Sequence, residues 1–160
     1  GAKKLNDLAV GAAKAMPGVQ FLHITGSSDF DRVSDKVSSS KNHKVLAFCD
    51  DMAAVYAVSD MAIMRSGASS LCEISYVGLA SILVPYPHAA DDHQTKNAEV
   101  FEKADAALLR QEEDIDAGSL VADITSVLDD TERLVNMSAA AEGLSVKNAA
   151  SIICAVITGR

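Results

Sequence analysis

The stretch MAIMRSGASSLCEISYVGLASILVPYPHAADDHQTKNA, residues 61–98, decides the fold. Its pattern predicts a strand, a Ser/Gly turn, a helix, a second strand, a polar loop and the start of another helix. Apolar strands that alternate with helices indicate right-handed crossovers and a parallel sheet. Because open α/β sheets bind ligands at the carboxyl ends of their strands, we expect the two loops of this stretch to form a site.

The same alternation extends through the rest of the chain and predicts one α/β domain, residues 1–160, with a Rossmann-like parallel sheet and flanking helices. A doubly wound domain normally opens on a strand, whereas this chain opens on a helical pattern, so we expect a first strand upstream of Gly1. Helices are predicted over residues 5–16, 30–37, 52–59, 69–77, 94–103, 119–128, 131–141 and 146–157, and strands over 19–25, 45–48, 61–64, 81–84 and 106–109.

Composition narrows the class of protein. The chain has 160 residues, 49% of them hydrophobic, and a formal net charge of −8. The acidic balance argues against a nucleic-acid partner, because phosphate neutralisation needs Lys and Arg. Three scattered cysteines match no zinc pattern and are typical of thiols in a reducing compartment. No signal peptide and no membrane-spanning run is expected, since the longest apolar run near the end covers only residues 149–158.

The turn at residues 65–70, RSGASS, joins a strand to a helix. Free amides at such a helix start, with the helix dipole behind them, can hold a diphosphate. Glu73 lies near the first helical turn, where a carboxylate can accept hydrogen bonds from a ribose diol. The alternative is an ordinary helix start in which Ser70 and Glu73 form a capping box.

Two further segments carry candidate polar chemistry. The run HAADDHQTKN, residues 88–97, suits a sugar-hydroxyl site, because the Gln94 and Asn97 amides both donate and accept and lie on one helix face. The alternatives there are a solvated loop with Asp92 as N-cap, or a metal bound by His88, Asp92 and His93. The run FCDDM, residues 48–52, could read a base edge, or could be an Asp N-cap over a core Phe. Separately, His23 is expected to be structural and His43 to lie in a surface loop.

Together these runs resemble one family. RSGASSLCEISYVGLASILVPYPHAADDHQTKNA (residues 65–98), FCDDMAAVYAVSD (48–60) and GAKKLN (1–6) are similar to motifs of the bacterial peptidoglycan GlcNAc transferases, GT-B enzymes of glycosyltransferase family 28. The resemblance implies the C-terminal, donor-binding half of an inverting enzyme that needs neither cofactor nor donor-site metal. Such an enzyme moves GlcNAc from UDP-GlcNAc to lipid I, undecaprenyl-diphospho-MurNAc-pentapeptide, giving lipid II. It works as a peripheral protein on the cytoplasmic face of the cell membrane.

Residue by residue, the resemblance implies a donor site that lacks most of the family's glycine turn before Lys3. Glu73 would bind the ribose hydroxyls, and Gln94 and Asn97 would face the GlcNAc and the nucleotide. His93 stands where the family often has Gln, so it is the candidate for the sugar 4-hydroxyl. The remaining donor-binding candidates are Phe48, Cys49 and Met52 near uracil, and Arg65, Ser66, Gly67, Ser69 and Ser70 near the diphosphate. The acceptor site, the membrane-docking patch and the catalytic base would lie in an N-terminal half, so we expect this chain alone to bind donor without transferring it.

Two other functions remain open. One is the catalytic subunit of a dolichol-linked GlcNAc transferase, whose chain is of similar size, although the FCDDMAAVYA and HQTKNA runs are more typical of bacterial enzymes. The other is a non-catalytic Rossmann-like or flavodoxin-like nucleotide-binding module. That module predicts a flavin or dinucleotide ligand, but the chain contains no GxGxxG motif.

Overall fold

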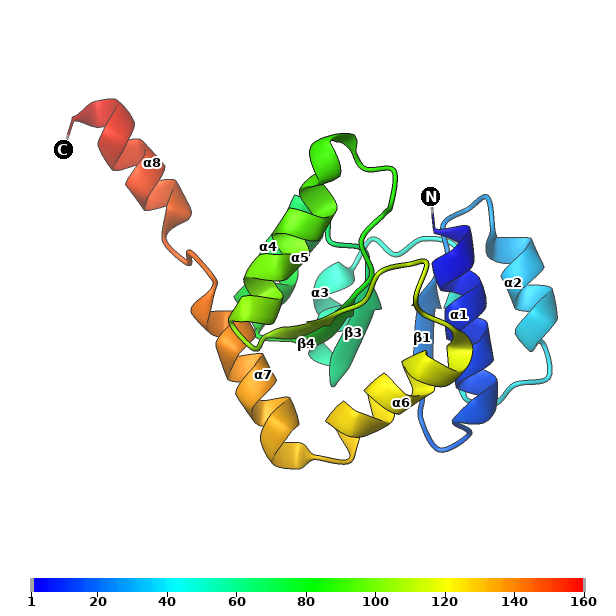
Figure 1. The fold of residues 1–160 in the computed structure, drawn as a ribbon. Coiled ribbons are helices and arrows are strands. Elements are labelled where there is room, and N and C mark those ends of the chain that lie inside the picture. The colour runs from blue at the N-terminus through cyan, green and yellow to red at the C-terminus, as the bar shows by residue number, and fades with distance from the viewer. Residues whose placement is uncertain (1, 160) are drawn as a thin grey trace.

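The computed structural model describes residues 2–159, so Gly1 of the GAKKLN run lies outside the described part. Helices and strands alternate up to the last strand, and three helices follow it (Figure 1). The helices are α1 (Lys3–Ala15), α2 (Phe30–Val37), α3 (Met52–Ala57), α4 (Ala68–Val77), α5 (His93–Lys103), α6 (Ala117–Leu128), α7 (Thr131–Gly143) and α8 (Ala149–Thr158). The strands are β1 (Phe21–Ile24), β2 (His43–Leu46), β3 (Met61–Met64), β4 (Ala80–Leu83) and β5 (Ala107–Leu109), and a 3-10 turn, η1 (Ala90–Asp92), precedes α5.

Every strand pairing is parallel, which confirms the predicted α/β class. β1 pairs with β2, while β3, β4 and β5 form a second group in that order. Within residues 2–159 the two groups are not hydrogen-bonded to each other, so the predicted sheet appears as two separately paired parts. The strand expected upstream of Gly1 is not part of this sequence and stays a prediction.

The core lies on both faces of β4, and all four residues of this strand are buried. Ile82 packs in a cluster with side chains of α1 and α6, whereas Leu83 packs in another with side chains of α4 and α5. Successive side chains of a strand point to opposite faces, so helices cover β4 on both sides. This burial explains why the residues of β4 other than Ser81 are apolar.

Local signals account for some of the helix ends. Gly78 ends α4 in the left-handed conformation, with φ at 68°, directly after the predicted end of this helix at residue 77. Asp116 caps α6 by accepting a hydrogen bond from the Ser119 backbone amide, so this helix begins two residues before the predicted start. The predicted strand 45–48 is displaced toward the amino end, because His43 begins β2 and pairs with Phe21 of β1.

The last helix, α8, extends away from the rest of the structure (Figure 1). None of its described residues is buried, and Ile153, Val156 and Ile157 are exposed. Across residues 2–159, no helix combines the length and the apolar character needed to cross a membrane.

Candidate functional site

The predicted site lies where β3 and β4 end at the same edge of their parallel pair. After β3, Gly67 is the N-cap of α4 in extended conformation, and no side chain caps this helix start. The first backbone amides of a helix have no intrahelical partner, so those of Ala68, Ser69 and Ser70 are available to an acceptor. With the positive end of the helix dipole behind them, they suit an anionic group.

Ser66 connects this turn to the start of α5 through hydrogen bonds. It is fully buried, and its hydroxyl donates to the backbone oxygen of Gln94 at 2.7 Å. The side-chain amide of Asn97 donates back to the Ser66 carbonyl oxygen at 3.1 Å. The structure therefore brings together Ser66, Gln94 and Asn97, three residues that the sequence placed in one donor site.

Gln94 is held through its side-chain oxygen, whereas Asn97 is held through its side-chain nitrogen. Gln94 Oε1 accepts from the Tyr86 backbone amide at 3.0 Å, whereas Asn97 uses Nδ2 in its bond to Ser66. Within residues 2–159, neither Gln94 Nε2 nor Asn97 Oδ1 makes a hydrogen bond. The pair therefore presents one donor and one acceptor, which is the combination that sugar hydroxyls match.

Arg65 connects the turn after β3 to the loop after β4 and to the loop that contains Glu112. Its Nη1 atom donates to the carbonyl oxygens of Val84 and Pro85 at 3.0 and 2.9 Å, and its guanidinium forms an ion pair with Glu112. The same guanidinium lies 5.5 Å from the centre of the Tyr86 ring. These contacts give Arg65 a positioning role that its place in the motif did not reveal, in addition to its predicted approach to the diphosphate.

Glu73 does not belong to a capping box, so that alternative is wrong. Ser70 lies inside α4, because the helix begins at Ala68 after the Gly67 cap. The Glu73 carboxylate is exposed and instead accepts a hydrogen bond from the Tyr56 hydroxyl at 2.7 Å. Burial, and then this bond, raise the pKa of Tyr56, so the phenol remains a protonated donor.

The stretch before α3 combines a helix cap with an exposed aromatic ring. Asp51 caps α3 by accepting from the Ala54 backbone amide at 3.0 Å, as one alternative predicted. Phe48, however, is 70% exposed and is not a core residue. Cys49 is half-buried beside it, and Met52 opens α3. An exposed ring at a strand end can stack on a base.

The loop before α5 is polar and exposed. His93 donates from Nδ1 to the Ala90 carbonyl oxygen at 2.6 Å if Nδ1 carries the proton, which leaves Nε2 as an acceptor. Asp92 is the N-cap of α5 by position, but its backbone is left-handed and its side chain makes no capping bond. Over residues 2–159, no group of three or more His, Cys, Asp or Glu side chains is arranged to hold a metal ion.

A buried histidine pair was missed by the sequence analysis. His43 is 7% exposed, so its prediction as a surface loop residue is wrong. Its Nε2 atom lies 3.1 Å from His23 Nδ1, and His23 Nε2 lies 3.0 Å from Asn6 Oδ1. Burial, and then the neighbouring His43, lower the pKa of His23 to about 4, and burial lowers that of His43. His23 and His43 lie in different strands, and the sequence around each gives no signal for such a pair.

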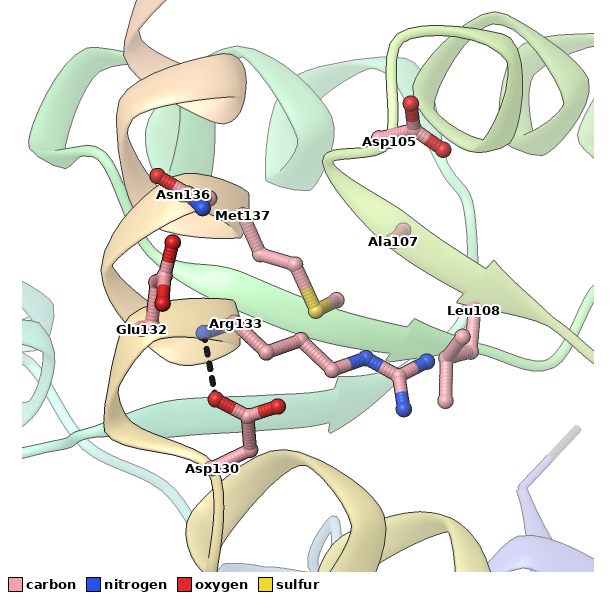
Figure 2. A pocket seen from close by; sticks show the side chains of 8 residues that line it. All are labelled: Asp105, Ala107, Leu108, Asp130, Glu132, Arg133, Asn136 and Met137. Carbon is pink, nitrogen blue, oxygen red and sulfur yellow. Dashed lines mark hydrogen bonds between the residues drawn. The ribbon is translucent and has the colours of Figure 1, made fainter.

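A hollow of about 460 Å³ lies at the opposite edge, where β5 begins, and contains none of the predicted donor-binding residues (Figure 2). Leu108 and Met137 form its apolar part, whereas Asp105, Asp130 and Arg133 bring charges of both signs. Asp130 accepts from the Arg133 backbone amide at 2.9 Å and thereby caps α7. Asp130 therefore serves the fold, and the mixed charges of this hollow define no single ligand chemistry.

Comparison with known proteins identifies similar chains. The model of the glycosyltransferase family 28 C-terminal domain matches residues 1–153. Two curated relatives are each named UDP-N-acetylglucosamine--N-acetylmuramyl-(pentapeptide) pyrophosphoryl-undecaprenol N-acetylglucosamine transferase. The one from Syntrophotalea carbinolica is 36% identical, with 98% of this chain and 45% of the relative covered. The one from Methylococcus capsulatus is 38% identical, with the same coverage of both chains. The chain thus spans a little under half the length of these relatives.

Solved structures agree with the sequence matches. The crystal structure of Acinetobacter baumannii MurG is similar over 100% of this chain and 47% of that one, with a TM-score of 0.89 and 29% identity. The glycotransferase of kitacinnamycin matches 92% of this chain and 37% of its own, with a TM-score of 0.67 and 17% identity. The second likeness concerns the fold alone.

Proposed function

Because the chain belongs to glycosyltransferase family 28, whose C-terminal domain it matches over residues 1–153, we propose that it binds the nucleotide-sugar donor of a GlcNAc transferase. The donor is UDP-GlcNAc. In the longer enzyme, GlcNAc passes with inversion to undecaprenyl-diphospho-MurNAc-pentapeptide, converting lipid I to lipid II at the cytoplasmic face of the membrane. The names of the relatives support the donor sugar and the lipid acceptor.

The observation that carries the proposal is the start of α4, which no side chain caps and which directly follows the hydrogen-bonded Ser66. The amides of Ser69 and Ser70 suit the diphosphate, and the Glu73 carboxylate suits the ribose hydroxyls. Gln94 and Asn97 present a donor and an acceptor to the sugar. Phe48, Cys49 and Met52 line the approach to α3, where the base would lie.

The chemistry of this half is positioning and charge stabilisation. When the bond between the sugar and the diphosphate breaks, negative charge develops on the departing UDP. Helix-start amides that already point at this charge stabilise it without reorganising. Arg65 contributes by holding the Val84 and Pro85 loop in place, and the catalytic base and the acceptor site belong to the remainder of the longer enzyme. We therefore expect donor binding without transfer by this chain alone.

The family match favours this function over the two alternatives. A non-catalytic flavin or dinucleotide module has no support from a match that covers residues 1–153 of a transferase family. A dolichol-linked transferase would use the same donor. The relatives' names specify an undecaprenol carrier, so the acceptor lipid distinguishes the two transferases.

Calorimetric titration of the chain with UDP-GlcNAc tests the proposal. Glu73→Ala is expected to weaken binding by about 1.5–3 kcal/mol, the value of a charge-assisted hydrogen bond. Glu113→Ala, which removes an exposed carboxylate from a turn outside the proposed site, is the control and is expected to leave the affinity unchanged. UDP-GalNAc, titrated in parallel, reports whether His93, Gln94 or Asn97 reads the sugar 4-hydroxyl. Absence of binding at millimolar UDP-GlcNAc would refute the donor site.

A further inference from the structure

Helices α3 and α4 are joined by the hydrogen bond from the Tyr56 hydroxyl to Glu73 Oε2, 2.7 Å long. We propose that Tyr56 is a positioning residue: it holds the Glu73 carboxylate in the orientation in which this group accepts hydrogen bonds from the ribose of the donor. The inference rests on the proposed donor site and adds a residue that no motif assigned.

The carboxylate needs such a partner because its own helix provides none. Glu73 lies on an exposed face of α4, beyond the first turn, so the helix start does not fix its side chain. An unrestrained Glu side chain loses roughly 1–2 kcal/mol of rotamer entropy when it is ordered. A hydrogen bond that forms before the ligand arrives removes part of this cost from binding.

Tyr56 is suited to the task because its ring is itself held. The ring is half-buried and packs against the apolar cluster that contains Leu71 and Ile74 of α4. The hydroxyl is therefore a donor at a fixed place, whereas a lysine would be a mobile charge. The bond uses one lone pair of Oε2, and Oε1 remains free to accept from a ribose hydroxyl.

The test compares ligands with and without the ribose diol. The chain, Tyr56→Phe and Tyr76→Phe are titrated calorimetrically with UDP and with 2′,3′-dideoxyuridine diphosphate. Tyr76 is an exposed tyrosine of α4 and provides the matched control. Tyr56→Phe is expected to weaken UDP binding roughly five- to tenfold, because the ordering of the Glu73 side chain then opposes binding, and to leave the dideoxy ligand unaffected. Tyr76→Phe changes neither affinity.

Several results would overturn the inference. Equal weakening of both ligands by Tyr56→Phe would mean that Tyr56 only supports packing, and unchanged UDP binding would mean that it supports nothing at the site. If the chain binds UDP but does not favour it over the dideoxy ligand, the ribose role of Glu73 fails while the donor site stands. If the chain does not bind UDP at millimolar concentration, the proposed function fails as well.

A second variant separates positioning from folding. Glu73→Ala removes the carboxylate that Tyr56 holds, and in that background Tyr56→Phe is expected to cost less than twofold. A full five- to tenfold loss in the double variant would contradict action through Glu73. Thermal melting followed by circular dichroism verifies that each variant is folded at the titration temperature.

Discussion

The buried histidine pair makes the stability of this chain depend on pH in a calculable way. Asn6 Nδ2 donates to Thr25 and Asp29, so Asn6 Oδ1 is an acceptor and His23 Nε2 must carry a proton. In the neutral ring, His23 Nδ1 then accepts from His43 Nε2. A second proton on His23 would set two donors against each other at this contact. Burial of the ring, and this contact while His43 keeps its proton on Nε2, therefore oppose protonation of His23.

The sign and size follow from the pKa of His23, which falls from its ordinary 6.5 to about 4 on folding. Between these values the unfolded chain binds more protons than the folded one, so acidification removes stability. The full difference corresponds to about 3 kcal/mol, and for a half-buried ring partly screened by solvent we expect a loss of about 1–2 kcal/mol between pH 7 and pH 5. Asp29, whose pKa is lowered by its bonds to Arg32 and Asn6, contributes its loss only at lower pH.

Urea denaturation at a series of pH values measures this effect, with His23→Gln as the comparison. A Gln at position 23 can donate to Asn6 and accept from His43, as the neutral ring does, but does not titrate. The variant is expected to lose about 1–2 kcal/mol less than the original chain between pH 7 and pH 5, and to keep only the part due to His43. A chain that is equally stable at both pH values, or a variant with the same pH dependence, would refute the assignment.

Three further predictions concern packing, a buried amide and the ion pair between Arg65 and Glu112. Gly11→Ala is expected to lower the free energy of unfolding by about 1–3 kcal/mol in urea, because the added Cβ would lie 2.7 Å from Cβ of Ala117 on α6. Asn42→Ala is expected to lower it by about 2–3 kcal/mol, seen as a lower melting temperature, because Asn42 Nδ2 donates to three carbonyl oxygens at 2.9–3.0 Å. Glu112→Gln is expected to weaken UDP-GlcNAc binding roughly three- to tenfold in calorimetry, because a neutral amide holds Arg65 less firmly.

Each of these three substitutions has a control substitution. Gly143→Ala places a Cβ with nothing within 4 Å, so an equal loss there would contradict the steric explanation of Gly11. Lys41→Ala alters the exposed residue before Asn42, and Glu113→Gln alters the exposed carboxylate after Glu112. If either control reproduced the effect of its neighbour, the specific hydrogen bond or ion pair would not be the cause.

Patterns that act locally were readable from the sequence. The mostly apolar sequence of β4 follows from burial on both of its faces, and the helical period of apolar residues in α6 follows from burial on one face. Gly78 was predictable as a helix end, since the left-handed conformation there suits glycine. The pairing of parallel strands followed from the alternation of elements, because a crossover helix leaves few other topologies.

Contacts between side chains that are distant in sequence could not be predicted. Tyr56 and Glu73 lie in different helices, Arg65 and Glu112 are 47 residues apart, and nothing in either neighbourhood indicates the other. The capping-box prediction failed for a related reason: Ser70 and Glu73 have the right spacing, but the N-cap is Gly67, so Ser70 already lies inside the helix. Spacing predicts which contacts are possible, and the helix boundary decides which ones form.

The internal bonds of the site also explain why its polar residues can be both structural and ligand-binding. Gln94 uses its oxygen and Asn97 uses its nitrogen to hold the loops, and each retains the complementary atom. Glu73 likewise uses one oxygen for Tyr56 and retains the other. A side chain whose orientation is fixed by one bond offers its remaining group without a further ordering cost. Substitutions here should therefore lower affinity in two ways, through the lost ligand contact and through the released loop, so Asn97→Asp, which keeps the free acceptor but loses the donor to Ser66, should weaken binding although its ligand-facing oxygen is retained.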